Sequence, residues 1–250
     1  VDTKERETVE KMVFDQQIEL RDIAFKYMDT GKPALDSISL SISKKQTVGL
    51  VGASGAGKTT IVDVLIGLLH PTEGKVLVDG KDIHESLFSW QKQIGYIPQS
   101  IFLADDTIKN NVAFGLPEQS IDESKVWEAL EIAQLDNFIK NTGDGLGTMV
   151  GENGVRLSGG QCQRIGIARA LYFDPDVLVM DEATAALDNK TERVFMESIE
   201  KLGRQKTIIL IAHRLTTVKN CDIILFLDQG CLIASGTYEE LMSKSPEFRR

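Results

Sequence analysis

The sequence predicts an α/β fold that combines a buried parallel sheet, an antiparallel β subdomain and an inserted helical region. Residues 177–180 and 207–211 are short, continuous apolar runs, which are typical of parallel strands buried on both faces. In residues 37–42, Ser alternates with Ile or Leu, which is the period of a half-buried strand in an antiparallel sheet. Residues 87–163 contain helical stretches and Gly-rich joints but few β-branched runs, which indicates a mostly helical insertion.

The composition supports one large folded domain. The chain has 250 residues, of which 42% are hydrophobic and 26% are charged, so we expect a real core and exclude disorder for most of the chain. The formal net charge of -9 argues against nucleic acid as a partner, because non-specific binding needs a concentrated positive surface. Cys162, Cys221 and Cys231 show no metal-ligand spacing, and we expect them to be reduced thiols in a cytosolic protein.

The sequence shows no segment that would insert into a membrane. Its longest apolar stretches, such as residues 61–69, are far shorter than the about 20 residues of a spanning helix. Residues 1–11 contain no apolar region of the kind found in a signal peptide. We therefore expect a domain that is soluble in isolation, and Val rather than Met at position 1 suggests a missing upstream segment.

The predicted domains follow the change of pattern along the chain. Residues 1–16 are polar and charged and are predicted to be a linker. Residues 17–86 and 164–250 are predicted to form the core with its antiparallel β subdomain, and residues 87–163 the helical subdomain. The expected strands include residues 38–42, 47–51, 75–78, 177–180, 207–211, 223–227 and 231–234, and the expected helices include residues 58–69, 124–134 and 190–202.

Residues 52–59 are the strongest local indication of chemistry. Their sequence, Gly-Ala-Ser-Gly-Ala-Gly-Lys-Thr, matches the phosphate-binding P-loop and lies between an expected strand and an expected helix. Glycines permit a tight turn whose N–H groups point at phosphate oxygens, and the following helix adds its positive N-terminal end. Lys58 would reach the β- and γ-phosphates, and the Thr59 hydroxyl would bind Mg²⁺. The alternative is a glycine-rich loop without a ligand.

Two carboxylates follow the apolar run that ends at residue 180. At the carboxyl end of a parallel strand, Asp181 suits coordination of Mg²⁺, directly or through water. Glu182 beside it would orient and deprotonate an attacking water. Two adjacent acids at a strand end are also a common surface feature, so this interpretation depends on the P-loop in the same chain.

A second anion-binding helix start is predicted at residues 157–161, Leu-Ser-Gly-Gly-Gln. Ser158 is a good N-cap residue, and the two glycines leave the first N–H groups of the helix uncovered. Such a helix start can hold a phosphate. The alternative is a capped helix after a flexible joint.

Together these motifs resemble the ATP-binding cassette of ABC transporters over about residues 18–245. Residues 52–59 resemble the Walker A loop of that family and residues 177–182 its Walker B strand, while residues 157–161 are identical to its signature. The resemblance implies a P-loop NTPase core of the RecA/F1 type, with an antiparallel β subdomain and an inserted helical subdomain that carries the signature.

Four single residues extend the resemblance. Gln99 occupies the Q-loop position, which implies a ligand of Mg²⁺ or water. Asp188 matches the D-loop, and His213 matches the switch histidine that contacts the γ-phosphate. Tyr27 lies where the family stacks an aromatic ring on adenine, although an aromatic residue in a strand more often packs against its neighbours.

The resemblance implies an ATPase that binds ATP and Mg²⁺ and works as a head-to-tail homodimer or pseudo-symmetric dimer. The residues implied in catalysis are Glu182, His213, Lys58 and Gln99. Those implied in ATP binding are Tyr27, Gly52, Ala53, Ser54, Gly55, Ala56, Gly57, Lys58, Thr59 and Thr60. Those implied to reach ATP across the dimer interface are Ser158, Gly159, Gly160, Gln161 and Asp188. The implied metal ligands are Thr59, Gln99 and Asp181.

Finer matches indicate the exporter type. Residues 106–112 and 148–154 resemble exporter segments, and the sequence around residues 90–91 and 94–99 resembles exporters of lipid-linked saccharides and other lipids. The resemblance implies transmembrane domains that are fused upstream, with this domain at the cytoplasmic face of a membrane. The dimer would drive these domains to move such a lipid or another substrate. Cys162 and Ala185 depart from the family pattern, but neither removes a group assigned to ATP chemistry.

Three other classes fit the sequence less well. A soluble ABC-type ATPase that acts on nucleic acid or the ribosome would carry coiled-coil arms or two cassettes, and this sequence contains neither. A GTPase would read guanine with Asn-Lys-x-Asp, whereas residues 189–192 are Asn-Lys-Thr-Glu. A small-molecule P-loop kinase is disfavoured because Glu182 beside Asp181 suits the activation of water.

Overall fold

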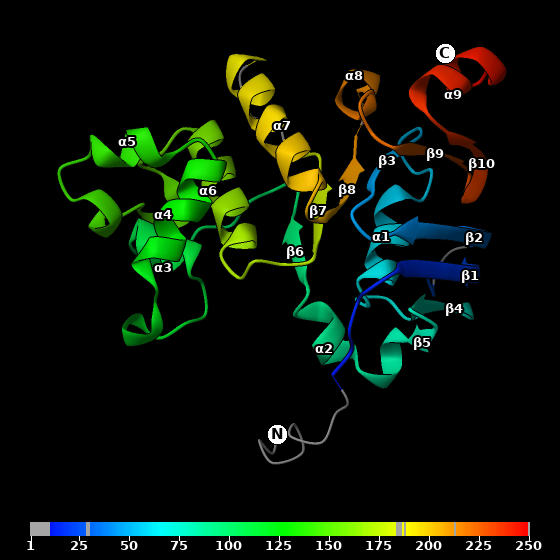
Figure 1. The fold of residues 1–250 in the computed structure, drawn as a ribbon, viewed down its shortest axis with the longest axis horizontal. Helices are drawn as coiled ribbons and strands as arrows, with labels where there is room; N and C mark the ends of the chain where they lie inside the picture. Colours follow the sequence, from blue (N-terminus) through cyan, green and yellow to red (C-terminus); the bar gives the residue numbers. More distant parts are fainter. Residues whose placement is uncertain (1–10, 29–30, 184–186, 188, 213, 250) are drawn as a thin grey trace. The chain divides into compact units, whose positions relative to one another are not determined.

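The computed structural model describes residues 11–28, 31–183, 187, 189–212 and 214–249 (Figure 1). The chain divides into two compact units. The first unit comprises residues 1–94 and 206–250, and the second comprises residues 95–205. No helix within the described ranges is long and apolar enough to span a membrane. The predicted bounds of the domains, including the core at residues 17–86 and 164–250, remain a prediction.

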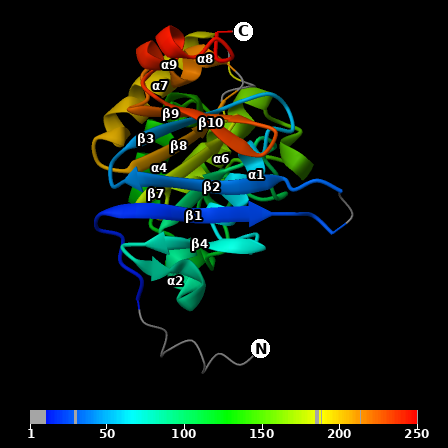
Figure 2. The same ribbon diagram turned by 90° about the vertical axis from the view of Figure 1, so that its right-hand side faces the viewer.

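The first unit contains the predicted antiparallel β subdomain. Its strands are β1 (Gln17–Phe25), β2 (Leu35–Ser43), β4 (Glu73–Val78) and β5 (Lys81–Asp82), in the order β2-β1-β4-β5. Figure 2 shows β2, β1 and β4 side by side. Ile18 pairs with Ile42 and Leu20 with Leu40, so the alternating side chains of β1 and β2 lie in register. The expectation of an antiparallel strand at residues 38–42 is confirmed.

A second group of strands in the first unit has the order β10-β9-β3-β8. The central strand β3 (Thr47–Val51) pairs in parallel with β8 (Thr207–Ile211) and with β9 (Ile223–Asp228). Every residue of β8 is buried, as its continuous apolar run predicts. Strand β10 (Cys231–Gly236) pairs antiparallel with β9, which confirms the predicted hairpin.

The helices of the first unit include the helix that follows the P-loop. They are α1 (Lys58–Leu65), α2 (Leu87–Gln91), α8 (Leu215–Val218), α9 (Tyr238–Lys244) and the 3-10 turn η2 (Ile83–Glu85). The prediction that α1 extends to residue 69 is wrong. Gly67 has a left-handed φ of 73°, and the N–H groups of Leu68 and Leu69 donate back to the Asp63 carbonyl. A left-handed glycine of this kind ends a helix.

The core of the first unit lies around α1. Apolar side chains from the antiparallel sheet, from α1 and from the parallel strands converge on one small cavity. The residues that line it are Leu20, Leu40, Ile42, Leu50, Ile61, Val62, Leu65, Ile209 and Leu225. The buried face of α1 is therefore held from several sides, which fixes the direction in which the helix points.

The second unit is mostly helical. Its strands β6 (Ile94–Ile97) and β7 (Val177–Asp181) are neighbours in a sheet. Its α-helices are α3 (Ile108–Val112), α4 (Glu123–Ile132), α5 (Asp136–Lys140), α6 (Gly159–Leu171) and α7 (Asn189–Gly203). Its 3-10 turns are η3 (Glu118–Ser120), η4 (Gly145–Gly147) and η5 (Glu152–Gly154). Helices α3 and α4 pack against α6, which confirms the predicted helical region.

Candidate nucleotide-binding site

The P-loop connects β3 to α1 in the first unit, as predicted. Lys58 is 6% exposed, and its Nζ donates to the carbonyls of Gly52 at 2.8 Å and Ala53 at 3.0 Å. Ser54 and Gly55 are exposed at the tip of the loop. The loop thus curls around the lysine and holds the ammonium group next to the turn where phosphate oxygens would lie.

The N-terminal end of α1 is left open by its sequence. Gly57 occupies the N-cap position with a left-handed φ of 102°, and no described side chain caps the helix there. No acidic residue lies in the first turn. The N–H groups of the first turn and the helix dipole therefore favour an anion at this end. Thr59 is exposed, and Thr60 is buried.

Tyr27 lies next to the first turn of α1. Its hydroxyl is 3.3 Å from Thr60 Oγ1, and its ring meets that of Phe25 edge-on at 4.9 Å between centroids. The Tyr27 side chain is still 42% exposed. The tyrosine is therefore held by two contacts while part of its side chain remains exposed.

In the second unit, Gln99 and Glu182 lie together. Strand β7 ends at the buried Asp181, and Glu182 follows it with a left-handed φ of 49°. Gln99 Nε2 donates to Glu182 Oε2 at 2.9 Å. A non-glycine residue with a positive φ is uncommon, and such conformations cluster at functional sites. The amide of Gln99 thus holds the carboxylate in a defined direction.

The signature begins helix α6 with a capping box. Gln161 N donates to Ser158 Oγ at 3.3 Å, and Ser158 N donates to Gln161 Oε1 at 2.7 Å. Ser158 and Gly159 are exposed, whereas Gly160 is partly covered. The prediction that Ser158 caps this helix is confirmed, and Gln161 has a second structural role that sequence reasoning missed. The sequence feature that indicates this role is a Gln three residues after the capping Ser.

Some of the predicted site residues lie outside the part of the chain that the structure describes, and others are divided between the two units. Asp188 and His213, together with Ala185, lie outside the described residues. The predicted metal ligands divide between the units, with Thr59 in the first and Gln99 and Asp181 in the second. A hydroxyl, an amide oxygen and a carboxylate are the hard oxygen donors that Mg²⁺ prefers, so these residue types fit the ion.

Sequence reasoning also missed a buried polar network in the second unit. Asn111 is fully buried, and Arg169 Nε donates to its carbonyl at 2.8 Å while Nη2 donates to its Oδ1 at 3.1 Å. Arg169 Nη1 donates to the Phe102 carbonyl at 2.9 Å. Burial lowers the pKa of Arg169. These bonds join α3 to α6, and no local pattern could have revealed them because the partners are 58 residues apart.

Cys162 follows the signature on α6. Its Sγ is 3.7 Å from the Gly154 carbonyl, and burial raises the pKa of the thiol. The thiol is therefore held in its neutral form and packs as a small apolar group. This departure from the family pattern leaves the helix start intact.

A P-loop between a parallel strand and an open helix end, beside an antiparallel subdomain, defines an α/β nucleotide-binding domain of the P-loop NTPase class. The comparisons with known proteins identify its family. A profile described as "ABC transporter" matches residues 35–185. The chain belongs to the ABC transporter family, as an ATPase domain of the exporter type.

Relatives of known name support this assignment. The chain is 43% identical over 224 residues to the "ATP-dependent lipid A-core flippase" of Ralstonia nicotianae, which covers 89% of this chain and 38% of the flippase. It is 42% identical over 232 residues to "Heavy metal tolerance factor 1" of Caenorhabditis elegans, which covers 92% of this chain and 29% of that protein. The chain thus spans less than half the length of these relatives.

A solved structure has the same fold. The structure of a bacterial Atm1-family ABC exporter with ATP bound superposes with a TM-score of 0.90 at 35% sequence identity. The match covers 97% of this chain and 42% of that exporter chain. The predicted fold class, an α/β P-loop NTPase with an antiparallel β subdomain and a helical region, is confirmed.

Proposed function

We propose that this domain hydrolyses Mg²⁺-bound ATP and that the hydrolysis powers an exporter. The observation that carries the proposal is the P-loop, in which a buried Lys58 lies beside an uncapped helix start. The triphosphate would replace the Gly52 and Ala53 carbonyls as the partner of the ammonium group. Tyr27, fixed by Phe25 and Thr60, would present its exposed ring to the adenine.

Mg²⁺ would be held by Thr59, Gln99 and Asp181 together with phosphate oxygens. Such an ion is usually bound through one or two carboxylates and the substrate phosphates, and Asp181 would be the carboxylate here. When bound, the ion would neutralise negative charge on the phosphates. The buried Asp181 would face it at the carboxyl end of β7.

Glu182 would act as the general base on the attacking water. Its position immediately after β7 and its hydrogen bond from Gln99 support this role, because a base must be held in a fixed direction to meet the water. Lys58 and His213 would stabilise the charge that develops on the γ-phosphate. The amide oxygen of Gln99 would bind the metal or the water, while its Nε2 keeps the hydrogen bond to Glu182.

In a head-to-tail dimer, the exposed start of helix α6 would have a role in binding ATP. Ser158, Gly159, Gly160 and Gln161 of one protomer would face the γ-phosphate held by the other, and Asp188 would contact the same interface. The exposure of Ser158 and Gly159 supports this role, because a backbone N–H must be accessible to meet a phosphate. Closure would then depend on ATP, and opening on its hydrolysis.

The whole protein would be a membrane exporter. Because the chain covers less than half of its relatives, we propose that the rest of the machine includes transmembrane domains, joined upstream, with this domain at the cytoplasmic face. Several of the similar proteins are named lipid A-core flippases, which supports a lipid or lipid-linked saccharide as the cargo.

The substitution Glu182→Gln tests the proposal. It removes the base while keeping the shape of the side chain, so ATP turnover should fall about 10²- to 10⁴-fold. ATP binding should persist, and an ATP-dependent dimer should accumulate, as measured by phosphate release and by light scattering during gel filtration.

The matched control is Glu128→Gln, which alters an exposed glutamate on α4. This variant should keep the turnover of the parent protein. If Glu182→Gln also kept its turnover, Glu182 would not be the base.

A further inference from the structure

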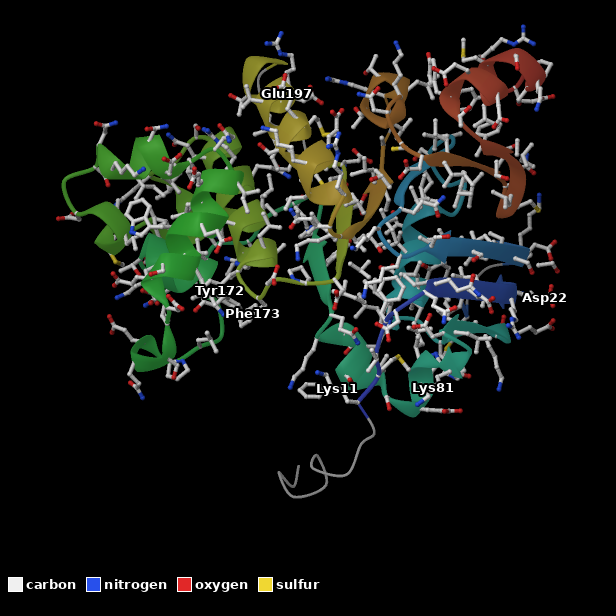
Figure 3. All side chains as sticks on the ribbon, viewed as in Figure 1. Lys11, Asp22, Lys81, Tyr172, Phe173 and Glu197 are labelled. Carbon is white, nitrogen blue, oxygen red and sulfur yellow. The ribbon has the colours of Figure 1, made fainter. Side chains whose placement is uncertain are left out.

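Residues 12–17, here called the strap, pack against the rest of the first unit, although the sequence predicts a linker up to residue 16. Met12 and Phe14 are only 2% and 1% exposed, whereas Val13 between them is 52% exposed. Figure 3 labels Lys11 at the start of this segment, beside α2. A charged linker would leave its occasional apolar residues in water, so the burial of alternate side chains indicates a specific docking site.

The aromatic ring of Phe14 fixes the centre of the strap. It meets the ring of the fully buried Trp90 on α2 edge-on, with 6.1 Å between the centroids. On another side, Lys44 Nζ lies 5.5 Å from the centroid of the Phe14 ring and donates to the Phe14 carbonyl at 2.5 Å. The ring is therefore enclosed by an aromatic edge and a cation.

Hydrogen bonds fix both ends of the strap. The Met12 N–H donates to Ser89 Oγ at 2.9 Å, and the Met12 carbonyl accepts from Gln93 Nε2 at 2.9 Å. At the other end, the Asp79 carboxylate accepts from the backbone N–H groups of residues 15, 16 and 17 at 2.5, 2.9 and 2.8 Å. These bonds pair backbone groups that an undocked strap would leave to water.

Trp90 connects the strap to the P-loop helix. Its indole Nε1 donates to the carbonyl of Leu65, the last residue of α1, at 2.9 Å. The next residue, Gln91, donates from Nε2 to the Ile66 carbonyl at 3.3 Å. The other end of the same helix begins with Lys58. A helix of eight residues is about 12 Å long, so one rigid element spans the distance from Trp90 to the phosphate loop.

We propose that the strap and Trp90 position α1, so that docking of the strap and binding of ATP favour each other. The inference rests on the proposed function, because it needs ATP to bind at the P-loop. Phe14 and Trp90 are positioning residues in this arrangement, since they act on the loop through α1. Displacement of the strap frees the indole to move from the Leu65 carbonyl, and α1 loses one of the contacts that hold its C-terminal end.

The experiment compares Phe14→Ala with Val13→Ala, which alters the exposed neighbour in the same strap. Phe14→Ala should weaken ATP binding about fivefold or more, because about fivefold is the lower end of the effects seen between coupled sites. The kcat at saturating ATP should stay close to the parent value. Val13→Ala should bind ATP like the parent. The dissociation constants come from isothermal titration with ATP and Mg²⁺, and kcat from phosphate release.

A second measurement uses reciprocity between coupled sites. If the strap strengthens ATP binding, ATP must strengthen docking of the strap by the same factor. Hydrogen exchange at the amides of Met12 and residues 15–17 should therefore be slower with ATP than without it, by about the factor seen in the dissociation constants. In Phe14→Ala the same amides should exchange faster.

Two results distinguish the inference from the function on which it rests. If the parent protein failed to bind ATP, the proposed function would fail and this inference with it. A second result would overturn the inference alone. In it the parent binds ATP and the strap amides of Phe14→Ala exchange faster, but Phe14→Ala binds ATP as tightly as the parent does. The strap would then have a structural role only. If Phe14→Ala does not fold, Trp90→Phe serves as the second variant, because it removes the indole N–H but keeps an aromatic ring. This variant must also weaken ATP binding if the inference is right.

Discussion

At the residue scale, the phosphate loop depends on the backbone of Gly57. This residue lies in the left-handed region, and a Cβ atom there would come within 2.8 Å of the Ala34 carbonyl oxygen. A side chain would therefore meet both conformational strain and a fixed backbone atom. Gly80 offers a comparison, since it has a φ of 82° but no heavy atom within 4 Å of its added Cβ.

We expect Gly57→Ala to be more harmful than Gly80→Ala. Left-handed strain costs about 1–2 kcal/mol in either variant, and only Gly57→Ala adds the clash with Ala34. The free energy of unfolding, measured by urea denaturation, should therefore fall further for Gly57→Ala, and ATP binding should weaken in that variant alone. Equal losses of stability in the two variants would contradict the steric argument.

At the scale of elements, two helices begin with the same device. Helix α6 starts with the capping box of Ser158 and Gln161, and α9 starts with that of Thr237 and Glu240. Both boxes satisfy backbone N–H groups that the first turn of a helix leaves unpaired. Only the box of α6 belongs to the motif that is proposed to face ATP.

The two caps therefore form a matched pair for mutation. Ser158→Ala and Thr237→Ala should each lower the free energy of unfolding by about 1 kcal/mol, because each removes one cap acceptor. Phosphate release should slow in Ser158→Ala and stay unchanged in Thr237→Ala. A similar loss of turnover in both variants would mean that stability, and not a contact with nucleotide, explains the effect.

At the scale of the whole molecule, the N-terminal strap is tied to the body of the first unit through Asp79. Burial alone would raise the pKa of this carboxyl, but three backbone N–H groups and Lys44 outweigh it, so the pKa is lowered. A carboxyl with a lowered pKa stabilises the folded state above its unfolded pKa of about 3.9. That contribution is lost as the pH falls through the lower pKa of the folded state.

Asp79→Asn tests this dependence on pH. At pH 7 the variant should unfold at lower urea concentration than the parent, because the three N–H groups lose a charged acceptor. As the pH falls below about 4, the unfolded chain takes up a proton at this carboxyl before the folded parent does, so the contribution of the charge to stability declines and the difference should shrink until the lower pKa of the folded state is passed. Urea midpoints measured across this range check the expectation, and a difference that stayed constant down to pH 2 would contradict it.

Much of the fold and part of the site could be predicted because their signals are local. The P-loop of residues 52–59 and the cap at Ser158 involve neighbours within a few residues, so their spacing alone indicates their geometry. The antiparallel strand at residues 38–42 has a two-residue period that no helix shares. The end of α1 was predicted too late, because apolar residues continue to Leu69 whereas Gly67 turns the chain.

The sequence by itself determined the family of this protein and indicated the residues proposed to carry its chemistry. Tertiary structure decided which of those residues meet. Gln99 reaches Glu182 across 83 residues, and Phe14 packs on Trp90 although Phe14 lies in the segment predicted to be a linker. The physical reason is that a motif needs only the geometry of consecutive residues, whereas such contacts depend on how distant elements pack. For that reason the predicted linker proved to be docked where the structure describes it.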